Sequence, residues 1–345
     1  MPSASLAHIA QRLSISKMSV SRALRGERHV SLALRERVLQ AAAEIGYRPD
    51  PEMTKLMKHL RLGRARSAPK KIAFVWTDLE KENQNAHSWP NQLLKGAHHQ
   101  AKRLGYEVEE FVLAQRGMTG RRLSGILEAR GIQSVIISPL ISRSRGHISM
   151  AWEKFASVVV GLGYARPALH RVHHHHYFGM MTAMRMLKKE RFRRIGFYCP
   201  STINERMFGA WSASFLTHHP LTQPGGLLAL RKAVTRGDFL QWVKKEKPEA
   251  IIDSGHALTD WLQELPARAR PQVVTLGWRA DRPTTAGIDQ QPASLGEAAV
   301  DLLVAQMQQN QRGVPAVPRL VLTEGVWRPA SASTSRAVSK RALEP

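Results

Sequence analysis

Near its amino terminus the chain runs LAHIAQRLSISKMSVSRAL over residues 6–24. The first half of this stretch places its apolar side chains on one helical face, at Leu6, Ile9, Ala10 and Leu13. The pattern breaks after this face, and Ser16 suits the N-cap of a second helix that runs to about Leu24. Two short helices joined by a tight turn predict a helix-turn-helix unit.

A third helix is expected directly after this unit. Ser31 suits its N-cap and Gly46 its end. The apolar stripe between them consists of Leu34, Val38, Ala41, Ala42 and Ile45. Residues 1–70 contain no Trp or Phe, and they hold 14 Lys and Arg against 5 Asp and Glu. A small basic domain with an Ala, Leu and Val core is therefore predicted for residues 1–48.

The second helix has the composition that a DNA-recognition helix needs. Such a helix turns apolar side chains inward and presents small or polar ones to the major groove. Val20, Ala23 and Leu24 suit the inner side. The outer side is then left to Lys17, Met18, Ser19, Ser21 and Arg22. The alternative is that the two cations are ordinary solvated charges on a surface helix.

The charge of the whole chain favours a polyanionic partner. Among its 345 residues, 51 are Lys or Arg and 27 are Asp or Glu, which gives a formal charge of +24. Such a surplus is typical of nucleic-acid-binding proteins, although a generally basic surface would produce it too. The hydrophobic fraction of 43% can form a sizeable core, which excludes a disordered tail protein.

Several classes of protein are excluded by what the sequence lacks. One cysteine, Cys199, permits neither an internal disulfide framework nor a cysteine-built zinc finger. No stretch approaches the ~20 apolar residues needed to cross a bilayer, and the first residues lack the basic region of a secretory signal. P-loop, G-x-S-x-G and HExxH motifs are missing. We therefore expect a cytoplasmic protein that is not an enzyme and needs no cofactor.

From Ile72 onward, short apolar runs alternate with helical stretches. The apolar runs are residues 72–76, 108–113, 135–138, 158–160, 195–198, 250–252 and 273–276. Helical patterns lie between them, for example over residues 92–104 and 119–129. This alternation predicts the α/β class with doubly wound parallel sheets, and seven or more strands fit two lobes better than one.

The amino-terminal stretch resembles a known DNA-binding head. Residues 6–24 are similar to the head of the lactose-repressor/galactose-repressor (LacI/GalR) family, and the similarity continues through residues 29–31, 35–38 and 42–49. Ser14 stands where the family usually has a turn glycine. The resemblance implies that base preference is set by Lys17, Met18 and Arg22. It also implies contacts with backbone phosphates or nearby bases by Ser16, Ser19, Ser21, His29 and Ser31.

The resemblance extends to a hinge over residues 49–70. An isolated helix of about ten residues is marginal in water, because its nucleation is costly. In the family, residues corresponding to 51–60 fold on DNA, pair with their twin in the dimer and wedge a leucine into the minor groove. Leu56 occupies that position here, and Met53 stands where a small residue is common. The alternative is an ordinary helix packed on the body.

Residues 71–329 resemble the family's effector-binding and dimerisation domain, which has the bilobed periplasmic-binding-protein fold. The expected lobe boundaries are about 71–164 and 290–319 for the first lobe, and about 165–289 and 320–329 for the second. The chain would then pass between the lobes near Tyr164–Arg166, near Asp289 and near Leu320. Residues 330–345 lack apolar periodicity and are predicted to be disordered.

Effector-binding residues are expected where parallel strands end, because ligands of such folds bind outside the carboxyl ends of the strands. By the resemblance, Trp89, Arg206 and Trp278 occupy usual effector positions. Asp78 and Asp253 follow predicted strands and suit hydroxyl recognition. Aromatic, carboxylate and arginine side chains together are typical of carbohydrate sites, although each of these residues could equally be structural.

Histidines set this body apart from the family pattern. His175 and His256 stand where Asp is frequent, which leaves the ligand class open. The run His173–His176 raises the possibility of a metal site, but four adjacent residues on one loop cannot all face one ion. We expect instead a polar loop before a helix over residues 178–189, and no metal.

These observations predict a dimeric, sequence-specific DNA-binding regulator, most simply a repressor, which binds a pseudo-palindromic operator. A small-molecule effector, such as a sugar or sugar derivative, would control its operator affinity. Two alternatives stay open. One is an architectural DNA-binding protein without a ligand. The other is a solute-binding receptor, which would need an export signal and no basic head.

Overall fold

The structure is a computed structural model that describes residues 5–24, 30–47, 69–77, 87–113, 116–140, 146–254 and 257–331. Its contacts divide the chain into two compact units, of which one comprises residues 1–70 and 304–312 and the other residues 71–303 and 313–345. We call the part before Lys71 the head and the part from Lys71 onward the body. Within the described ranges, no helix has both the length and the apolarity to span a bilayer. The predictions that fall outside these ranges concern His29, the hinge helix with Met53 and Leu56, Asp78, His256 and the tail beyond residue 331.

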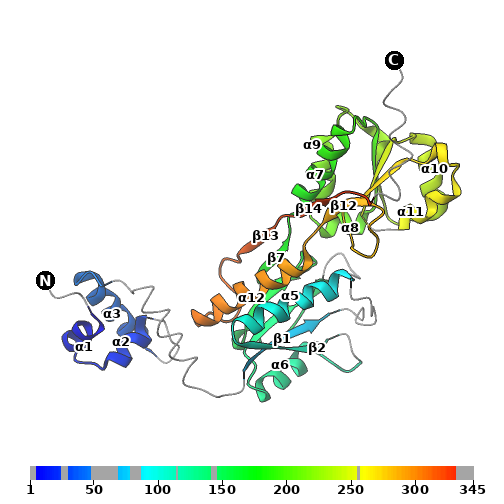
Figure 1. The fold of residues 1–345 in the computed structure, drawn as a ribbon. Helices are drawn as coiled ribbons and strands as arrows, with labels where there is room; N and C mark the ends of the chain where they lie inside the picture. The colour runs from blue at the N-terminus through cyan, green and yellow to red at the C-terminus, as the bar shows by residue number, and fades with distance from the viewer. Residues whose placement is uncertain are drawn as a thin grey trace. The chain divides into compact units, whose positions relative to one another are not determined.

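The head consists of α1 (Leu6–Leu13), α2 (Lys17–Leu24) and α3 (Leu32–Glu44), which Figure 1 draws in blue. The helices bury the apolar faces that the sequence predicts, at Ile9, Ala10, Val20, Ala23, Val38, Ala41 and Ala42. The predicted helix-turn-helix backed by a third helix is therefore confirmed.

Serine side chains define the turns of the head. The turn after α1 is left-handed at Ser14, with φ +53°, so it forms without the glycine that adopts this conformation most easily. Ser16 precedes α2 and caps it as predicted, because its Oγ accepts the backbone N–H of Ser19 at 3.0 Å. Ser31 caps α3 in the same way, through the N–H of Leu34 at 3.3 Å.

The first lobe of the body contains a sheet of six described strands in the order β13-β7-β5-β3-β1-β2. Its strands are β1 (Lys70–Trp76), β2 (Tyr106–Val112), β3 (Ser134–Ile137), β5 (Ala156–Val160), β7 (His170–His174) and β13 (Leu320–Thr323). Neighbours from β13 to β1 pair in parallel. The lobe also contains α5 (Trp89–Arg103), α6 (Gly120–Ala129), α12 (Pro292–Gln308) and a small sheet of β4 (Gly146–His147) and β6 (Tyr164–Arg166).

The second lobe has a sheet in the order β14-β12-β11-β10-β8-β9, again counting described strands. Its strands are β8 (Ile195–Pro200), β9 (Leu228–Arg231), β10 (Ala250–Asp253), β11 (Gln272–Thr275), β12 (Ala286–Asp289) and β14 (Val326–Arg328). They pair in parallel, except that β14 is antiparallel to β12.

Helices cover both faces of this second sheet. Figure 1 shows α7 (His176–Lys189) and α9 (Ala210–His218) on one face, and α10 (Arg236–Glu246) and α11 (Ala257–Trp261) on the other. The short helix α8 (Ser201–Arg206) follows β8. The predicted architecture of two doubly wound, largely parallel sheets is therefore confirmed.

Strand pairing decides where the chain passes between the lobes. The strand β7 pairs with β5 and β13 in the first sheet, so the passage expected near Tyr164–Arg166 lies after His174 instead. The passage near Asp289 follows β12, where it is expected. The last passage lies between β13 and β14, at residues 324–325 rather than near Leu320. Both corrections concern long-range pairing, which local sequence does not specify.

The histidine run belongs to regular structure, so the predicted polar loop is wrong. His173 and His174 end β7, and His176 begins α7. Between them, His175 caps α7, because its Nδ1 accepts the backbone N–H of Phe178 at 3.3 Å. His173, His174 and His176 are buried. Imidazole is polar by residue type, but in its neutral form it carries no charge to desolvate, so it can be packed in the interior.

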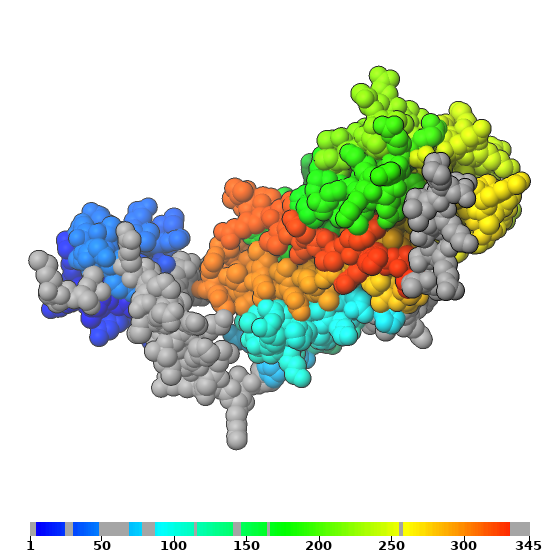
Figure 2. Space-filling view, turned by 45° about the horizontal axis from the view of Figure 1, so that its top comes forward, coloured from blue at the N-terminus to red at the C-terminus, as the bar shows by residue number. Residues whose placement is uncertain are grey.

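Helices α5 and α12 approach each other backbone to backbone. A Cβ at Gly96 would overlap the carbonyl oxygen of Ala293, and a Cβ at Gly296 would overlap the carbonyl oxygen of Leu93. In Figure 2 the two helices, cyan and orange, form one continuous surface. Glycine at both positions is therefore required for this packing.

Candidate DNA-recognition surface and effector site

The outer side of α2 exposes both polar and apolar groups. Lys17 and Arg22 are exposed, and Met18 exposes 62% of its surface, whereas Val20 and Ala23 on the inner side are fully buried. Met18 and Arg22 are four residues apart, so they lie on the same face one turn from each other. An arginine can donate two hydrogen bonds to a guanine edge, and a methionine can contact a thymine methyl group.

Two serines of the head, Ser16 and Ser31, cap helices through their hydroxyl groups. Ser16 Oγ lies 2.9 Å from Ser19 Oγ, besides accepting the backbone N–H of Ser19. Ser31 is exposed, and Ser21 is half-buried. A hydroxyl that accepts a capping hydrogen bond still carries its own O–H donor. Hydroxyl donors at helix amino termini are common ligands of the DNA backbone.

The described head keeps a positive charge after its internal pairing. Arg12 of α1 forms an ion pair with Glu44 of α3, which connects these helices. Glu36 is the remaining acid among the described head residues. Besides Arg12, the described head contains the cations Lys17, Arg22, Arg35 and Arg37. Their field favours a phosphate backbone.

In the body, the carboxyl edges of the two sheets face each other. Arg206, at the end of α8, donates from its guanidinium to the carbonyl oxygen of Leu140, which follows β3, at 3.4 Å. Trp89, at the start of α5, donates from Nε1 to Oε1 of Gln290, which follows β12, at 3.0 Å. Residues that follow strands of one lobe therefore meet residues that follow strands of the other, where this type of fold places its ligands.

Gln290 connects two of the predicted aromatic positions. Its Nε2 donates to the carbonyl oxygen of Leu276 at 2.6 Å, two residues before Trp278. The guanidinium of Arg328 lies over the Trp278 ring, 5.6 Å from its centroid. The buried Nε1 of Trp278 has no hydrogen-bond partner among the described residues. Sequence reasoning does not predict Gln290 or Arg328 as site residues, because their roles depend on contacts across the sheet.

Asp253 is more enclosed than a position after a strand would suggest. It is the last residue of β10 and is 3% exposed. The charges of Asp253 and Arg206 both act on Cys199, and burial raises the pKa of the Cys199 thiol to about 12. This thiol therefore stays protonated and unreactive. Asp253 and Arg206 therefore both lie close enough to Cys199 for their charges to influence it.

The buried histidines stack where the chain first leaves the first lobe. The rings of His173 and His176 are stacked with centroids 5.6 Å apart, and His174 meets His176 edge-on at 5.2 Å. Burial lowers the pKa of His174 to about 3, and it also lowers the pKa of His173 and of His176. These rings are therefore neutral near pH 7. Within the described ranges, no three His, Cys, Asp or Glu side chains gather in a way that could hold a metal ion.

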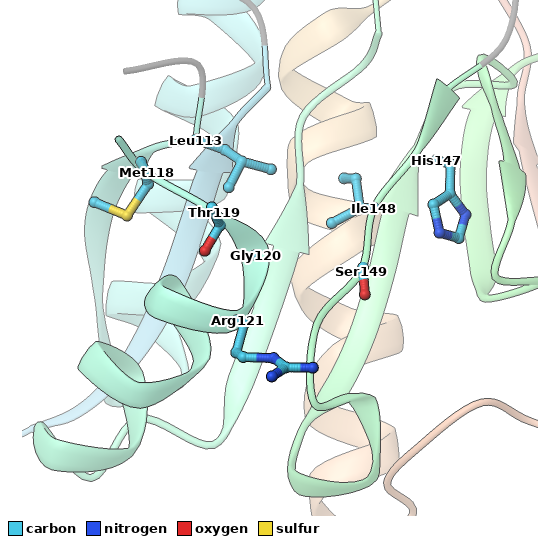
Figure 3. Close-up of a pocket in the computed structure, with 8 residues that line it drawn as sticks. All are labelled: Leu113, Met118, Thr119, Gly120, Arg121, His147, Ile148 and Ser149. Carbon is cyan, nitrogen blue, oxygen red and sulfur yellow. The ribbon is translucent and has the colours of Figure 1, made fainter. Parts of the chain in front are cut away.

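A groove of about 400 Å³ lies at the start of α6 (Figure 3). Its lining residues are Leu113, Met118, Thr119, Gly120, Arg121, His147, Ile148 and Ser149. Figure 3 shows Arg121 extending from α6 toward the segment that carries Ser149. Of the predicted effector residues that the structure describes, none lines this groove. It is therefore a separate feature of the first lobe.

Comparisons with known proteins agree with this architecture. Residues 5–50 match the family model described as bacterial regulatory proteins, lacI family. No curated protein matches the chain. Among solved structures, the chain is similar to a transcriptional regulator CelR–cellobiose complex, with a TM-score of 0.55, 18% identity, and coverage of 94% of this chain and 99% of that chain.

Two further structures show the same fold. The lac repressor dimer bound to operator and the anti-inducer ONPF gives a TM-score of 0.54 at 19% identity, covering 94% of this chain and 98% of that chain. The LacI-family regulator CCPA from Weissella paramesenteroides, with bound glucose, gives 0.55 at 12% identity, covering 75% and 97%. The head matches the family model and the whole chain has the family's fold. Residues 5–50 are therefore a head of the lacI family of bacterial regulatory proteins, and the chain as a whole has the fold of these solved regulators.

Proposed function

We propose that α2 lies in the major groove of an operator, where Lys17, Met18 and Arg22 contact base edges. The observation that carries this proposal is the exposed, mixed surface of α2 in a head of the lacI type. Backbone phosphates or nearby bases would be bound by Ser16, Ser19, Ser21 and Ser31. The contact by His29 and the minor-groove wedge by Leu56 stay predictions from the sequence.

We infer that the chain acts as a dimer on an inverted repeat. The lac repressor, which has this fold, was solved as a dimer bound to operator. In a twofold dimer, two recognition helices meet two half-sites about one helical turn apart, so the operator mirrors the symmetry of the protein. We expect repression, because a dimer bound at a promoter excludes other proteins from the same DNA.

The proposed effector is a sugar or sugar derivative that binds where the carboxyl edges of the sheets meet. Trp89 and Trp278 would supply aromatic faces for a sugar ring, and Arg206 and Asp253 would supply hydrogen bonds to its hydroxyl groups. Two regulators with this fold are described with cellobiose and with glucose. Asp78 would belong to the same site, although it lies outside the described residues.

Control of operator affinity would follow from the arrangement of the two lobes. A ligand that contacts both lobes favours the arrangement in which both sets of contacts form. The head joins the first lobe at Lys70, where β1 begins, so this shift can change the fraction of dimers able to bind the operator. A coupling free energy of about 1–3 kcal/mol would change operator affinity roughly 5–150-fold.

Selection of binding sites from a randomised duplex library by the full-length protein tests the DNA proposal. We expect enrichment of one inverted repeat. Uniform binding of all duplexes, with a steep salt dependence, would instead support an architectural DNA-binding protein and contradict the regulator with base specificity.

Mass spectrometry of small molecules that co-purify with the protein tests the effector proposal. We expect a sugar or sugar derivative that changes the affinity for the selected inverted repeat when it is added back. A co-purified compound that binds the body but leaves this affinity unchanged would contradict its role as an effector.

A further inference from the structure

Basic residues of the second lobe gather at one edge of its sheet. Residues 185–194 and 244–249 hold nine Lys and Arg against three Glu. They lead from α7 into β8 and from α10 into β10, so both segments lie at the amino edge of the second sheet, opposite the predicted effector residues. Because α7 and α10 cover opposite faces (Figure 1), the charge extends around this edge from one face to the other. We call these two segments the basic edge.

The cations of the basic edge project into solvent. Its exposed cations are Arg185, Lys188, Lys189, Arg191, Arg193, Arg194, Lys244, Lys245 and Lys247. The side chain of Lys245 is 83% exposed, while that of Glu246 is only 18% exposed. A partner that approaches this edge therefore meets a surface dominated by positive charge.

Hydrogen bonds hold the two segments together and direct one acid toward the backbone. The Glu249 carboxylate accepts the backbone N–H of Arg193 at 2.7 Å and that of Arg194 at 2.9 Å. In the other direction, Arg194 donates from Nε to the carbonyl oxygen of Lys247 at 3.3 Å. The basic edge is therefore one connected surface rather than two independent loops.

Helix stability alone does not explain these charges. Lysines in the last turn of a helix stabilise its carboxyl terminus, and this accounts in part for those at the ends of α7 and α10. Arg191 and Lys247, however, have left-handed backbones with φ +66° and +46°. Glycine is favoured in that conformation. Both residues also come after the last residue of their helix, so the helix terminus does not account for them as it does for the lysines of the last turn.

The chemistry of the basic edge selects among anionic partners. None of the exposed large hydrophobic residues of the described chain lies within 185–194 or 244–249. Protein interfaces depend on aromatic or aliphatic anchors, and membrane-surface helices insert apolar side chains. A phosphate backbone needs neither, because it is bound mainly by Lys and Arg. For a DNA-binding regulator, the polyanion that fits these features is duplex DNA.

We propose that the basic edge is a second binding surface for duplex DNA, which contacts phosphates without sequence preference and is separate from the head. It would bind a DNA segment other than the one held by α2, either flanking the operator or distant from it on the same molecule. The proposal does not depend on the identity of the effector.

Matched charge variants of the full-length protein test this surface. The edge variant carries Lys188→Gln, Lys189→Gln, Lys244→Gln and Lys245→Gln. The control variant removes the same charge from exposed positions of the first lobe, through Lys95→Gln, Lys102→Gln, Arg116→Gln and Arg121→Gln. The measurement is the affinity of each protein for a long random-sequence duplex as a function of salt concentration.

We expect the edge variant to bind more weakly and with a smaller salt dependence than the control. Each lost phosphate contact lowers the slope of log K against log salt by about 0.9, so a decrease of about 2–4 is expected for the edge variant and less than about 1 for the control. Equal changes in both variants, or no change in either, would overturn the proposal. Polyglutamate serves as a probe for an acidic protein partner. If the edge variant bound polyglutamate more weakly than wild type but bound the random duplex equally well, the proposal would be overturned in favour of such a partner.

Photo-cross-linking of the unmodified protein to the same duplex gives a test that does not depend on how the variants fold. We expect cross-linked peptides from residues 185–194 or 244–249 in addition to peptides from the head. Cross-links confined to the head would overturn the proposal.

Discussion

Arg22 lies one turn from Met18 on the exposed side of α2, and it is the residue best suited to read a guanine. We predict that Arg22→Ala lowers the affinity for the selected inverted repeat by about 1–3 kcal/mol, because two hydrogen bonds to one base are lost. Binding to random duplex should change little. Fluorescence anisotropy with both duplexes measures the difference. The control is Arg35→Ala, which removes an exposed arginine of α3. If Arg22→Ala lowered the affinity for both duplexes equally, base recognition by Arg22 would be contradicted.

His174 is enclosed where the chain passes between the lobes. A Cβ at Gly179 or at Gly325 would lie 2.7 Å from its ring. Burial lowers its pKa to about 3 in the folded state, whereas the unfolded residue titrates near 6.5. The unfolded chain therefore binds a proton that the folded chain does not, so this residue's contribution is complete above pH 6.5 and is lost as the pH falls toward 3.

Between pH 7 and pH 5, the free energy of unfolding of wild type should fall by about 2 kcal/mol more than that of a His174→Leu variant, because only wild type has this histidine. Urea unfolding at the two pH values measures the loss for each protein, and any constant effect of the substitution cancels in the comparison. His98→Leu, at an exposed position of α5, should behave like wild type. The same pH dependence in the His174→Leu variant and in wild type would show that His174 is not the group responsible.

At the scale of elements, the contact between α5 and α12 depends on glycine. We predict that Gly296→Ala destabilises the body by about 1–3 kcal/mol, because the added methyl group would overlap the carbonyl oxygen of Leu93. Gly125→Ala in α6 is the matched control, since its Cβ would meet nothing within 4 Å. That change should stabilise the protein by about 0.4–1 kcal/mol. A melting temperature below that of wild type for Gly296→Ala and above it for Gly125→Ala would support this packing. Equal shifts in the two variants would contradict it.

At the scale of the whole molecule, Gln290 connects the start of α5 to the passage between the lobes. It accepts from Trp89 and donates to the carbonyl oxygen of Leu276. We predict that Gln290→Ala reduces the change in operator affinity caused by the effector by roughly 3–10-fold, because the hydrogen bond from Trp89, which joins the two lobes and contributes about 0.5–1.5 kcal/mol, is lost. Titration of the co-purified compound into the complex of protein and operator measures this change in affinity. Gln241→Ala, on the exposed side of α10, should leave the response intact, and an intact response in the Gln290→Ala variant would exclude this connection.

The elements of the head and most strands of the body were predictable because their signals are local. Ser16 and Ser31 cap the helices that their positions predict. The apolar stripe from Leu6 to Ile45 packs into one core. The inward and outward sides of α2 follow from a period of 3.6 residues, so the candidate DNA surface is also recoverable from sequence. The effector residues stay a prediction, which rests on the resemblance for Trp89, Arg206 and Trp278 and on the place after a strand for Asp253. The hydrogen-bond partners of Trp89 and Arg206 could not be predicted, because they lie far away in the sequence.

The amino-acid sequence by itself determined the helix-turn-helix head, the alternation of strands and helices, and which side chains of α2 face outward. These features follow from periodicity and capping, which act within a few residues. Only the tertiary structure decided that β7 belongs to the first lobe, that His174 is a buried neutral residue and that Gln290 connects Trp89 to Leu276. It also brought residues 185–194 and 244–249 to one edge. These features depend on strand pairing and packing between residues far apart in the chain, and no local pattern encodes which distant partner a strand will choose.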